Sequence, residues 1–578
     1  MNDIEVETEV LLLEHDVRHG KWSDNVLSCL PKSTELPEDQ SNLRQDLRKG
    51  AEGERIVFSV DPPGCVDIDD ALHCKLMDNG NYECGVHIAD VAYYIDADSA
   101  LDEEAALRGT SVYLVDRRID MLPPLLSTDL CSLHPNVDRF AFSVVWEITP
   151  KAEIVDTWFH RSIIHSSAAL AYADAQKRID TKKPDDEITR GCIRMMSIAK
   201  QLKAQRKARG ALSLDSSEQK FKLNDKKRPE ACTPYPMYDA NFMIEEFMLL
   251  ANITVAKRIL QQFPKIAMLR RHPTPTPVML EPLVKAAKLK GVQVSIEASK
   301  QLSESIDNAE AKDVENFNSL LKMKAIKCLT QAVYFSSGDY DPAQYLHYGL
   351  ASEIYTHFTS PIRRYADIVV HRQLANAIQI SSIPESMQDR KRFKEICDNI
   401  NKRHWNAQYV SRASNELFTL FFFESKGEQI LKAIISDVRK TAVWVWIEQY
   451  CYERRVNLVT REDLEGTNPW EFDEDNMILS RTSPPCVMYK LHDVVTVKVW
   501  VHTSKMHRKK IRVEIVDEKY SKETEAEPSR KRQADAVLKG KDEESGVSPG
   551  AKRIKLEEKA KEIGQRLEEI QLSTTLRL

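Results

Sequence analysis

Apolar and polar positions divide the chain into regions of different character. Between residues 51 and 426, short apolar runs typical of buried strands alternate with longer helical patterns. The strand-like runs are Ile56–Val60, Val86–Ile88, Val112–Val115 and Phe142–Ile148, and the clearest helical pattern is the mostly apolar segment Met243–Phe263. Strands and helices mixed in this way predict an α+β fold.

Residues 427–518 show a stricter pattern, in which apolar and polar positions alternate. The alternation is clearest at residues 442–447 and recurs at 495–501 and 511–515. Several short alternating strands over this length predict a small β-barrel of the OB class. The outward Trp444, Trp446 and Lys498 could stack on and steer a nucleic acid. Alternatively, the two tryptophans pack under barrel loops or against the neighbouring domain, and the sequence leaves both interpretations open.

The two ends of the chain differ from both regions. Residues 1–50 contain one strand-like run, Val10–Leu13, and one strand cannot form an independent domain. From residue 519 the sequence is highly charged and poor in aromatic residues, which predicts a largely disordered tail. Two basic clusters there, Ser529–Arg532 and Ala551–Leu556, resemble nuclear localisation signals, although solvated charge runs are the usual alternative. Helical spacing from Leu556 to Ile570 predicts at most a transient or partner-induced helix.

Composition narrows the class of protein. A chain of 578 residues with 42% hydrophobic and 29% charged residues is long enough for roughly three or four globular domains. Its net charge of −6 requires any nucleic-acid surface to be a local groove. The 11 cysteines form no C-x-x-C pair, which argues against structural zinc and fits reduced thiols. Because the acidic start lacks the features of a signal peptide and no apolar run approaches a membrane span, we expect a soluble intracellular protein.

The main chemical candidate is an acidic stretch that follows the first strand-like run. Asp61, Asp67, Asp69 and Asp70 fall within ten residues, and Pro62–Gly64 breaks the strand between the first and second of them. Four carboxylates this close repel one another and must take up protons or share a cation. A hard divalent ion with oxygen ligands, Mg²⁺ or Mn²⁺, would satisfy them.

Two other structures compete with a metal site for this stretch, an aspartate-rich turn and a calcium loop. Aspartate-rich turns are common, because aspartate hydrogen-bonds its own backbone. A calcium loop of the EF-hand type does not fit, since Leu72 stands where that loop requires glycine after Asp67. The combination of strand, proline–glycine break and spaced acids therefore favours a metal site.

A second candidate lies at Thr359–Arg372. Ser360 is a good N-cap and Pro361 suits a first helical turn, which predicts a helix that starts here. That helix would carry Arg363, Arg364, Asp367 and Arg372. A phosphate near its N-terminus would meet free backbone N–H groups and a guanidinium group together. The alternative is an ordinary salt bridge between Arg364 and Asp367, which are spaced i,i+3.

Polar and aromatic residues elsewhere complete the set of candidates. Glu245 and Asn252 lie seven residues apart on the predicted helix, and the apolar residues between them favour an inward orientation over the alternative of two solvent-facing groups. Tyr113 and Tyr172 are the aromatic candidates, although most tyrosines in such positions are packed core residues.

Three motifs in order resemble the RNase II (RNB) family of exoribonucleases. They are Asp61–Cys65 with Asp67–Ala71, then Gly85–Val91, then Tyr355–Tyr365. The resemblance runs to about residue 518 and is closest to the branch that supplies the catalytic exoribonuclease of the eukaryotic RNA exosome. It implies an RNB catalytic domain at 51–426, an OB-fold domain of the S1 RNA-binding type at 427–518 and a tail at 519–578.

The N-terminal region departs from that branch, whose members carry a PIN endonuclease domain and two cold-shock barrels before the catalytic domain. We expect residues 1–50 to be the last strand of the second barrel followed by a linker. The chain would then be an isoform, a fragment or an incomplete gene model, which puts binding to the exosome core in doubt.

The resemblance also implies a role for each candidate residue. Asp61, Asp67 and Asp70 would hold one or two Mg²⁺ ions, with Mn²⁺ as the alternative, and Asp69 would orient the attacking water or complete the second metal site. Arg363 would stabilise the scissile phosphate and Tyr113 would stack on the 3′-terminal base. Tyr172 would be a further channel contact, and Glu245 and Asn252 could bind ribose hydroxyls, which helps distinguish RNA from DNA.

The activity implied is processive, hydrolytic 3′→5′ degradation of single-stranded RNA to nucleoside 5′-monophosphates, with no DNA or membrane partner. The location implied is the nucleus (nucleolus or nucleoplasm), with the cytoplasm as an alternative or additional location. Two alternatives remain open. One is a catalytically silent RNA-binding or scaffold protein, and the other is a metal nuclease that cuts DNA equally well.

Overall fold

The computed structural model of the chain describes residues 3–37, 43–48, 55–213, 219–460, 463, 465, 468–484, 486–505 and 508–516. The predicted tail, with its basic clusters and helical spacing, lies outside these residues. Within them, no helix combines the length and the apolar character that a membrane span requires.

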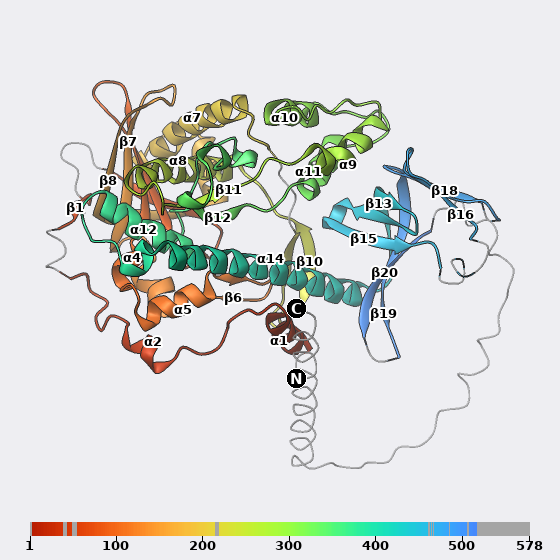
Figure 1. The fold of residues 1–578 in the computed structure, drawn as a ribbon, viewed down its shortest axis with the longest axis horizontal. Coiled ribbons are helices and arrows are strands. Elements are labelled where there is room, and N and C mark those ends of the chain that lie inside the picture. The colour runs from red at the N-terminus through yellow and green to blue at the C-terminus, as the bar shows by residue number, and fades with distance from the viewer. Residues whose placement is uncertain are drawn as a thin grey trace, which may run out of the picture. The chain divides into compact units, whose positions relative to one another are not determined.

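The predicted catalytic region, which ends at residue 426, is built on a six-stranded sheet (Figure 1). Its strands are β1 (Gln45–Asp46), β2 (Val57–Asp61), β3 (Asp70–Leu76), β4 (Tyr82–Ala89), β7 (Asp138–Ile148) and β8 (Ile154–Ala171). They run in the order β1-β8-β2-β3-β4-β7, and β7 also pairs with β8. The 18-residue β8 pairs antiparallel with β7 along its first part and parallel with β2 at its end, so the pairings from β2 through β7 return to β2.

Helices and short elements complete this region. Before and within the sheet lie α1 (Asp3–Glu14), α2 (Asp24–Ser28), α4 (Val91–Tyr94), α5 (Ala100–Arg108), β5 (Val112–Tyr113), β6 (Arg118–Ile119) and η1 (Leu125–Leu130). After the sheet follow α6 (Tyr172–Ile179), α7 (Glu187–Ala208), β9 (Gln219–Leu223), β10 (Pro229–Pro234), α8 (Asp239–Gln262), β11 (Met268–Arg271), α9 (Pro277–Lys288), α10 (Ser299–Asp307) and α11 (Phe317–Cys328). The region ends with β12 (Val333–Ser336), η2 (Ser337–Asp339), η3 (Pro342–Gln344), η4 (Tyr348–Leu350), α12 (Tyr365–Ala377), α13 (Glu385–Gln388) and α14 (Arg390–Lys426).

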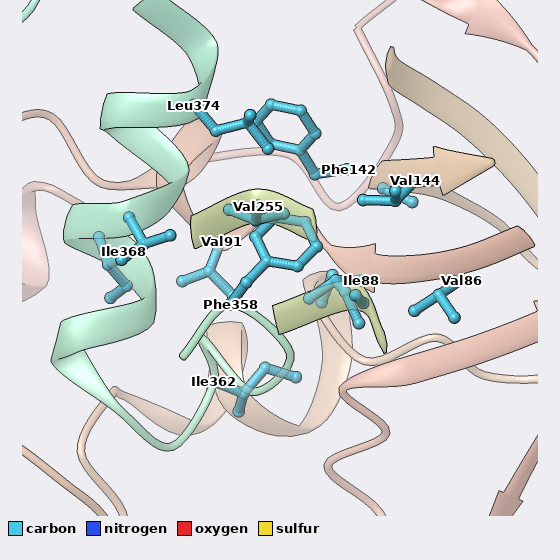
Figure 2. Packing of buried hydrophobic residues seen from close by; sticks show 14 of the residues in the cluster. Val86, Ile88, Val91, Phe142, Val144, Val255, Phe358, Ile362, Ile368 and Leu374 are labelled. Carbon is cyan, nitrogen blue, oxygen red and sulfur yellow. The ribbon is translucent and has the colours of Figure 1, made fainter. Parts of the chain in front are cut away.

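One apolar core joins the sheet to α8 and α12, as Figure 2 shows. Among its fully buried residues are Val86 and Ile88 of β4, Phe142 and Val144 of β7, Val255 of α8, Phe358 and Ile362 of the loop before α12, and Ile368 and Leu374 of α12. Burial of each such side chain contributes about 1.5–3 kcal/mol. Because Phe358 and Ile362 belong to this core, the loop between them is held against the sheet.

The prediction of a strand at Val10–Leu13 was wrong, because this run lies in helix α1. Ile4, Thr8 and Leu12 are buried at a spacing of four, which is the helical period, whereas Val10 and Leu13 are exposed. Ile4 packs on aromatic side chains of α14, and Leu12 packs on Val410 of the same helix. The described part of residues 1–50 therefore contains no such barrel strand.

The C-terminal region forms a separate sheet. Its strands are β13 (Gln429–Arg439), β14 (Ala442–Ile447), β15 (Tyr452–Asn457), β19 (Val494–Thr503) and β20 (Lys509–Ile515), with η5 (Glu448–Tyr450) after β14. The order β15-β14-β13-β19-β20, in which the outer strands β15 and β20 also approach each other, is that of the predicted OB-class barrel. A three-stranded sheet not expected from the sequence interrupts it, formed by β16 (Trp470–Asp473), β17 (Ile478–Arg481) and β18 (Val487–Lys490). Figure 1 shows α14 reaching from the catalytic region to this barrel.

The two outward tryptophans of β14 face the catalytic region. Trp444 and Trp446 line two cavities, of about 550 and 220 Å³, that share Leu320 and Met323 of α11 as wall residues. Lys498 forms an ion pair with Glu428 at 2.8 Å. The structure therefore places both tryptophans on the side of the neighbouring domain, the second of the two alternatives that the sequence left open.

Candidate active site

The acidic stretch lies where the chain passes from β2 to β3. Asp61 is the last residue of β2 and Asp70 the first of β3. Between them the Ser132 hydroxyl donates to the carbonyl of Val66 at 2.9 Å and accepts the N–H of Ile68 at 3.0 Å. Both ends and the middle of the loop are thus fixed by the fold. The sequence predicted the strand and the proline–glycine break before the acids, and it did not predict the Ser132 contacts.

Asp69 and Arg363 meet across 294 residues of sequence. One carboxylate oxygen of Asp69 accepts the backbone N–H of Ile362 at 2.9 Å, and the other accepts Arg363 Nε at 3.2 Å. Arg363 Nη2 also donates to Ser360 Oγ at 3.0 Å, and 43% of the arginine side chain remains exposed. Burial raises the pKa of Asp69 to about 7, while the charge of Arg363 lowers it in part.

Of the four acids of this stretch, Asp61 and Asp70 are the two with an unpartnered buried oxygen. Atom Oδ2 of each is buried and has no hydrogen-bond partner among the described residues. Burial, with the nearby charge of Asp67, raises the pKa of Asp61 to about 6. Burial, with the charges of Asp61 and Asp69, raises the pKa of Asp70 well above its usual value. Two orphaned carboxylate oxygens that repel each other are the arrangement that a divalent cation relieves, so these two residues fit a metal.

Asp67 is engaged differently from the other acids. It forms an ion pair with Arg118, accepts the Tyr113 hydroxyl at 3.3 Å and contacts Cys65 Sγ at 3.5 Å. In the part of the chain that the structure describes, no three His, Cys, Asp or Glu side chains are arranged to hold a metal ion. The predicted ligand set is therefore not assembled as it stands, because Arg118 already neutralises Asp67.

The prediction that a helix starts at Ser360 and Pro361 was wrong. Helix α12 begins at Tyr365, and Ser360 to Arg363 form a turn in which the Ser360 carbonyl accepts the N–H of Arg363 at 3.3 Å. The Ser360 N–H donates to Asp367 Oδ1 at 2.7 Å, which ties the turn to the helix behind it. This turn points Arg363 at Asp69.

Arg364 and Arg372 have structural partners. Arg364 forms two hydrogen bonds with Asp367, at 2.7 and 2.8 Å, so the salt-bridge interpretation is confirmed for this arginine. Arg372 donates to both oxygens of Asp102 in the protein interior, at 2.8 and 3.1 Å. Arg363 alone of the three faces the acidic loop.

The predicted inward orientation is confirmed for Asn252 and wrong for Glu245. The Asn252 amide donates to the Tyr355 hydroxyl at 3.1 Å and accepts the N–H of Phe358 at 2.7 Å, and the residue is 3% exposed. The Glu245 side chain is 53% exposed and lies 3.4 Å from Arg206, whose main partner is the buried Glu246. On α8 the buried acid is thus one position later than expected.

Both candidate tyrosines lie beside the acids. The Tyr113 ring is 44% exposed, and its hydroxyl contacts Asp67 at 3.3 Å. Tyr172 opens α6 directly after Ala171, which is the register partner of Asp61 in the sheet. Burial and the charges of Asp70 and Asp61 raise the pKa of Tyr172.

Sequence reasoning missed Arg118 and Ser132. Arg118 pairs with Tyr113 across the short β5–β6 hairpin, and this brings its guanidinium to Asp67. The only sequence signal was the Asp116–Arg118 turn, which is typical of many surface loops. Ser132, 64 residues from Ile68 in sequence, gave no signal at all.

Comparison with known proteins identifies relatives of this chain. The family model described as RNB domain matches residues 44–380. "Exosome complex exonuclease RRP44 homolog A" of Arabidopsis thaliana is 48% identical over 82% of this chain and 50% of its own length, so the chain spans about half the length of the curated relatives it matches.

Solved structures share the fold at low sequence identity. "Mycoplasma genitalium RNase R in complex with ribose methylated single-stranded RNA" matches with a TM-score of 0.77 and 22% identity, over 89% of this chain and 78% of that one. "Structure of yeast Ssd1, a pseudonuclease" matches with a TM-score of 0.72 and 20% identity, over 89% of this chain and 73% of that one.

Proposed function

The chain belongs to the RNB family, and on that premise we propose that it is a hydrolytic 3′→5′ exoribonuclease that degrades single-stranded RNA processively to nucleoside 5′-monophosphates. The observation that carries the proposal is the contact between Asp69 and Arg363 at 3.2 Å beside the orphaned oxygens of Asp61 and Asp70. Acids and a guanidinium placed together match the demands of phosphodiester hydrolysis, which needs an activated water and a stabilised anionic transition state.

Asp61 and Asp70 would hold Mg²⁺, with Mn²⁺ as the alternative, and Asp67 would join them on release from Arg118. When bound, the ion supplies charge neutralisation and Lewis acidity at the scissile phosphate. The unpartnered buried oxygens of Asp61 and Asp70 support this assignment.

The chain's own residues would divide the remaining work. Arg363, whose side chain is half-exposed, would bind the non-bridging phosphate oxygens where negative charge develops. Asp69, with a pKa of about 7, would orient the attacking water and accept its proton near neutral pH. Tyr113 would stack on the 3′-terminal base and so fix the bond that is cut.

Further contacts with RNA would lie at Tyr172 and at the exposed Glu245. Asn252 would act through the loop it holds, since its amide is already bonded to Tyr355 and Phe358. The name of the Arabidopsis relative supports a role in exosome-linked RNA processing and decay, and we propose a nuclear location on the basic clusters of the tail.

A catalytically silent RNA-binding protein is the second candidate. Two observations favour it, namely the ion pair that occupies Asp67 and the similarity in fold to a pseudonuclease. Both candidates bind RNA, and only the first digests it.

Digestion of a uniformly labelled oligoadenylate separates the two candidates. We expect wild type to release adenosine 5′-monophosphate with Mg²⁺ and not with EDTA, and to leave a deoxyadenylate intact. Asp69→Asn should slow release about 10²- to 10⁴-fold, with RNA binding nearly unchanged. Asp78→Asn, at an exposed turn, is the matched control and should digest normally. Normal release by Asp69→Asn would show that the assignment is wrong.

A further inference from the structure

A cavity of about 490 Å³ lies between β12 and α14, away from the acidic loop. Figure 1 shows these two elements side by side. Its apolar wall includes Tyr340 and Trp405, and its polar wall includes Lys394, Asp398 and Asn401. Pockets of about 300–1,000 Å³ are the size that small ligands occupy. Nothing in the proposed reaction uses this cavity.

Two aromatic rings in the cavity are exposed. Trp405 is 41% exposed and Tyr340 is 38% exposed, although rings of this size gain most from burial. Tyr340 is held from behind, because the guanidinium of Arg271 lies 4.3 Å from its ring centre and Phe335 meets it edge-on at 5.3 Å. Two exposed rings in one cavity, of which Tyr340 is held in place, offer flat faces on which a base can stack.

The α14 wall adds a free positive charge. Lys394, Asn401 and Trp405 share one helix face, at spacings of seven and four residues. Among the described residues, no carboxylate lies within 4.0 Å of Lys394 Nζ, whereas Lys402 beside it is paired with Asp16 at 3.1 Å. An unpaired lysine next to exposed rings suits a phosphate attached to a stacked base.

The floor of the cavity touches the loop that carries Arg363. Asn401 bonds both backbone groups of Tyr334, accepting its N–H at 2.7 Å and donating to its carbonyl at 2.8 Å. The Tyr334 hydroxyl bonds His357 Nδ1 at 2.5 Å, and His357 lies six residues before Arg363. A wall of the cavity is therefore hydrogen-bonded to the segment that leads to Arg363, and the cavity shares no residue with the candidate active site.

We propose that this cavity is a second nucleotide-binding site, in which a base stacks on Trp405 and Tyr340 and its phosphate binds Lys394. The nucleotide is either one unit of a single-stranded RNA or a free 5′-monophosphate. The site goes beyond the proposed function and does not depend on it, since the acidic loop contributes nothing to it.

Equilibrium dialysis with two probes tests the site. The background is the full chain with Asp69→Asn in EDTA, and the probes are 5′-AMP and a five-nucleotide oligoadenylate. We expect Trp405→Leu to weaken one binding event about 10-fold or more, from the loss of a stacked base. Lys394→Gln should weaken the same event and reduce its salt slope by about one. Tyr409→Leu and Lys391→Gln, exposed on the same helix and outside the cavity, are the matched controls.

The outcomes separate the two sources of the nucleotide. An effect of Trp405→Leu on 5′-AMP binding indicates a free mononucleotide, and an effect on the oligoadenylate alone indicates an RNA strand. The proposal is overturned if neither probe responds to Trp405→Leu, or if the control variants change binding as much. Because Lys394 is an exposed side chain, Lys394→Gln keeps the test valid if Trp405→Leu does not fold.

A cross-linking experiment gives an independent readout. Irradiation of the wild-type chain with 8-azido-AMP should label a peptide that contains Tyr340 or Trp405, and label found only near Asp61–Asp70 would contradict the second site. If the wild-type chain shows this labelling but does not digest RNA, the proposed function is wrong and the second nucleotide-binding site is still supported.

Discussion

Replacing Asn252 with alanine separates two explanations of this residue. The amide could contact ribose directly, or it could hold the loop that presents Arg363. In the structure it donates to Tyr355 at 3.1 Å and to Thr359 at 3.4 Å, and it accepts the N–H of Phe358 at 2.7 Å. All three partners belong to that loop, so the structure favours the second explanation.

The expected magnitude follows from these bonds. Asn252→Ala leaves the buried N–H of Phe358 without a partner, which costs about 1–3 kcal/mol, and removes two further hydrogen bonds worth about 1 kcal/mol or less each. We expect the free energy of unfolding to fall by about 2–4 kcal/mol, measured by urea titration. Activity should fall through kcat, because Arg363 loses its fixed position, while the preference for RNA over DNA stays the same.

The control and the refuting result are both specific. Asn25→Ala, at an exposed position of α2, should change the free energy of unfolding by less than about 0.5 kcal/mol. If Asn252→Ala retains full stability and loses discrimination between ribose and deoxyribose oligomers, the loop explanation is wrong and the amide contacts the substrate.

Three further predictions follow from single contacts. Arg118→Gln frees Asp67 from its ion pair, so half-maximal activity should need about fivefold less Mg²⁺, and an unchanged or higher requirement would contradict this. Gly85→Ala would place a methyl group 2.3 Å from the buried ring of His73, so urea titration should show a loss of about 1–3 kcal/mol, and no loss would mean that the ring moves freely. Burial holds the pKa of His87 well below 6.5, so the folded state keeps it neutral while the unfolded state takes up a proton as the pH falls. The free energy of unfolding of His87→Gln, relative to that of wild type, should therefore rise by about 2 kcal/mol when the pH falls from 7 to 5. A rise near zero would show that His87 is protonated in the fold.

The sequence was sufficient for the parts of the site that lie within motifs. The strand and the proline–glycine break placed the acids on a loop that leaves a strand, and this depends on local backbone geometry, which neighbouring residues determine. The role of Arg363 came from the family resemblance alone, and its contact with Asp69 joins residues 294 positions apart.

The features that the sequence predicted wrongly or missed depend on contacts between distant segments of the chain. Arg118 reaches Asp67 only because the β5–β6 hairpin folds over the acidic loop. Ser360 looked like an N-cap, yet its N–H is bonded to Asp367 and the chain turns before the helix begins. In α1, the burial of Ile4 at helical spacing from Leu12 outweighed a short apolar run, because α14 supplies the surface that covers them.

The return of β8 to β2 has a consequence for how the protein is made. Val57 pairs with Ser166, so the closed ring of strand pairings from β2 through β7 and β8 back to β2 can form only after the ribosome has synthesised more than a hundred residues beyond Val57. Until then β2 presents unpaired amide groups, which can recruit a strand from another nascent chain. Loops of this span close slowly. We therefore expect chaperones to bind the nascent chain mainly until the end of β8 emerges from the ribosome, and to be released once β8 has paired with β2.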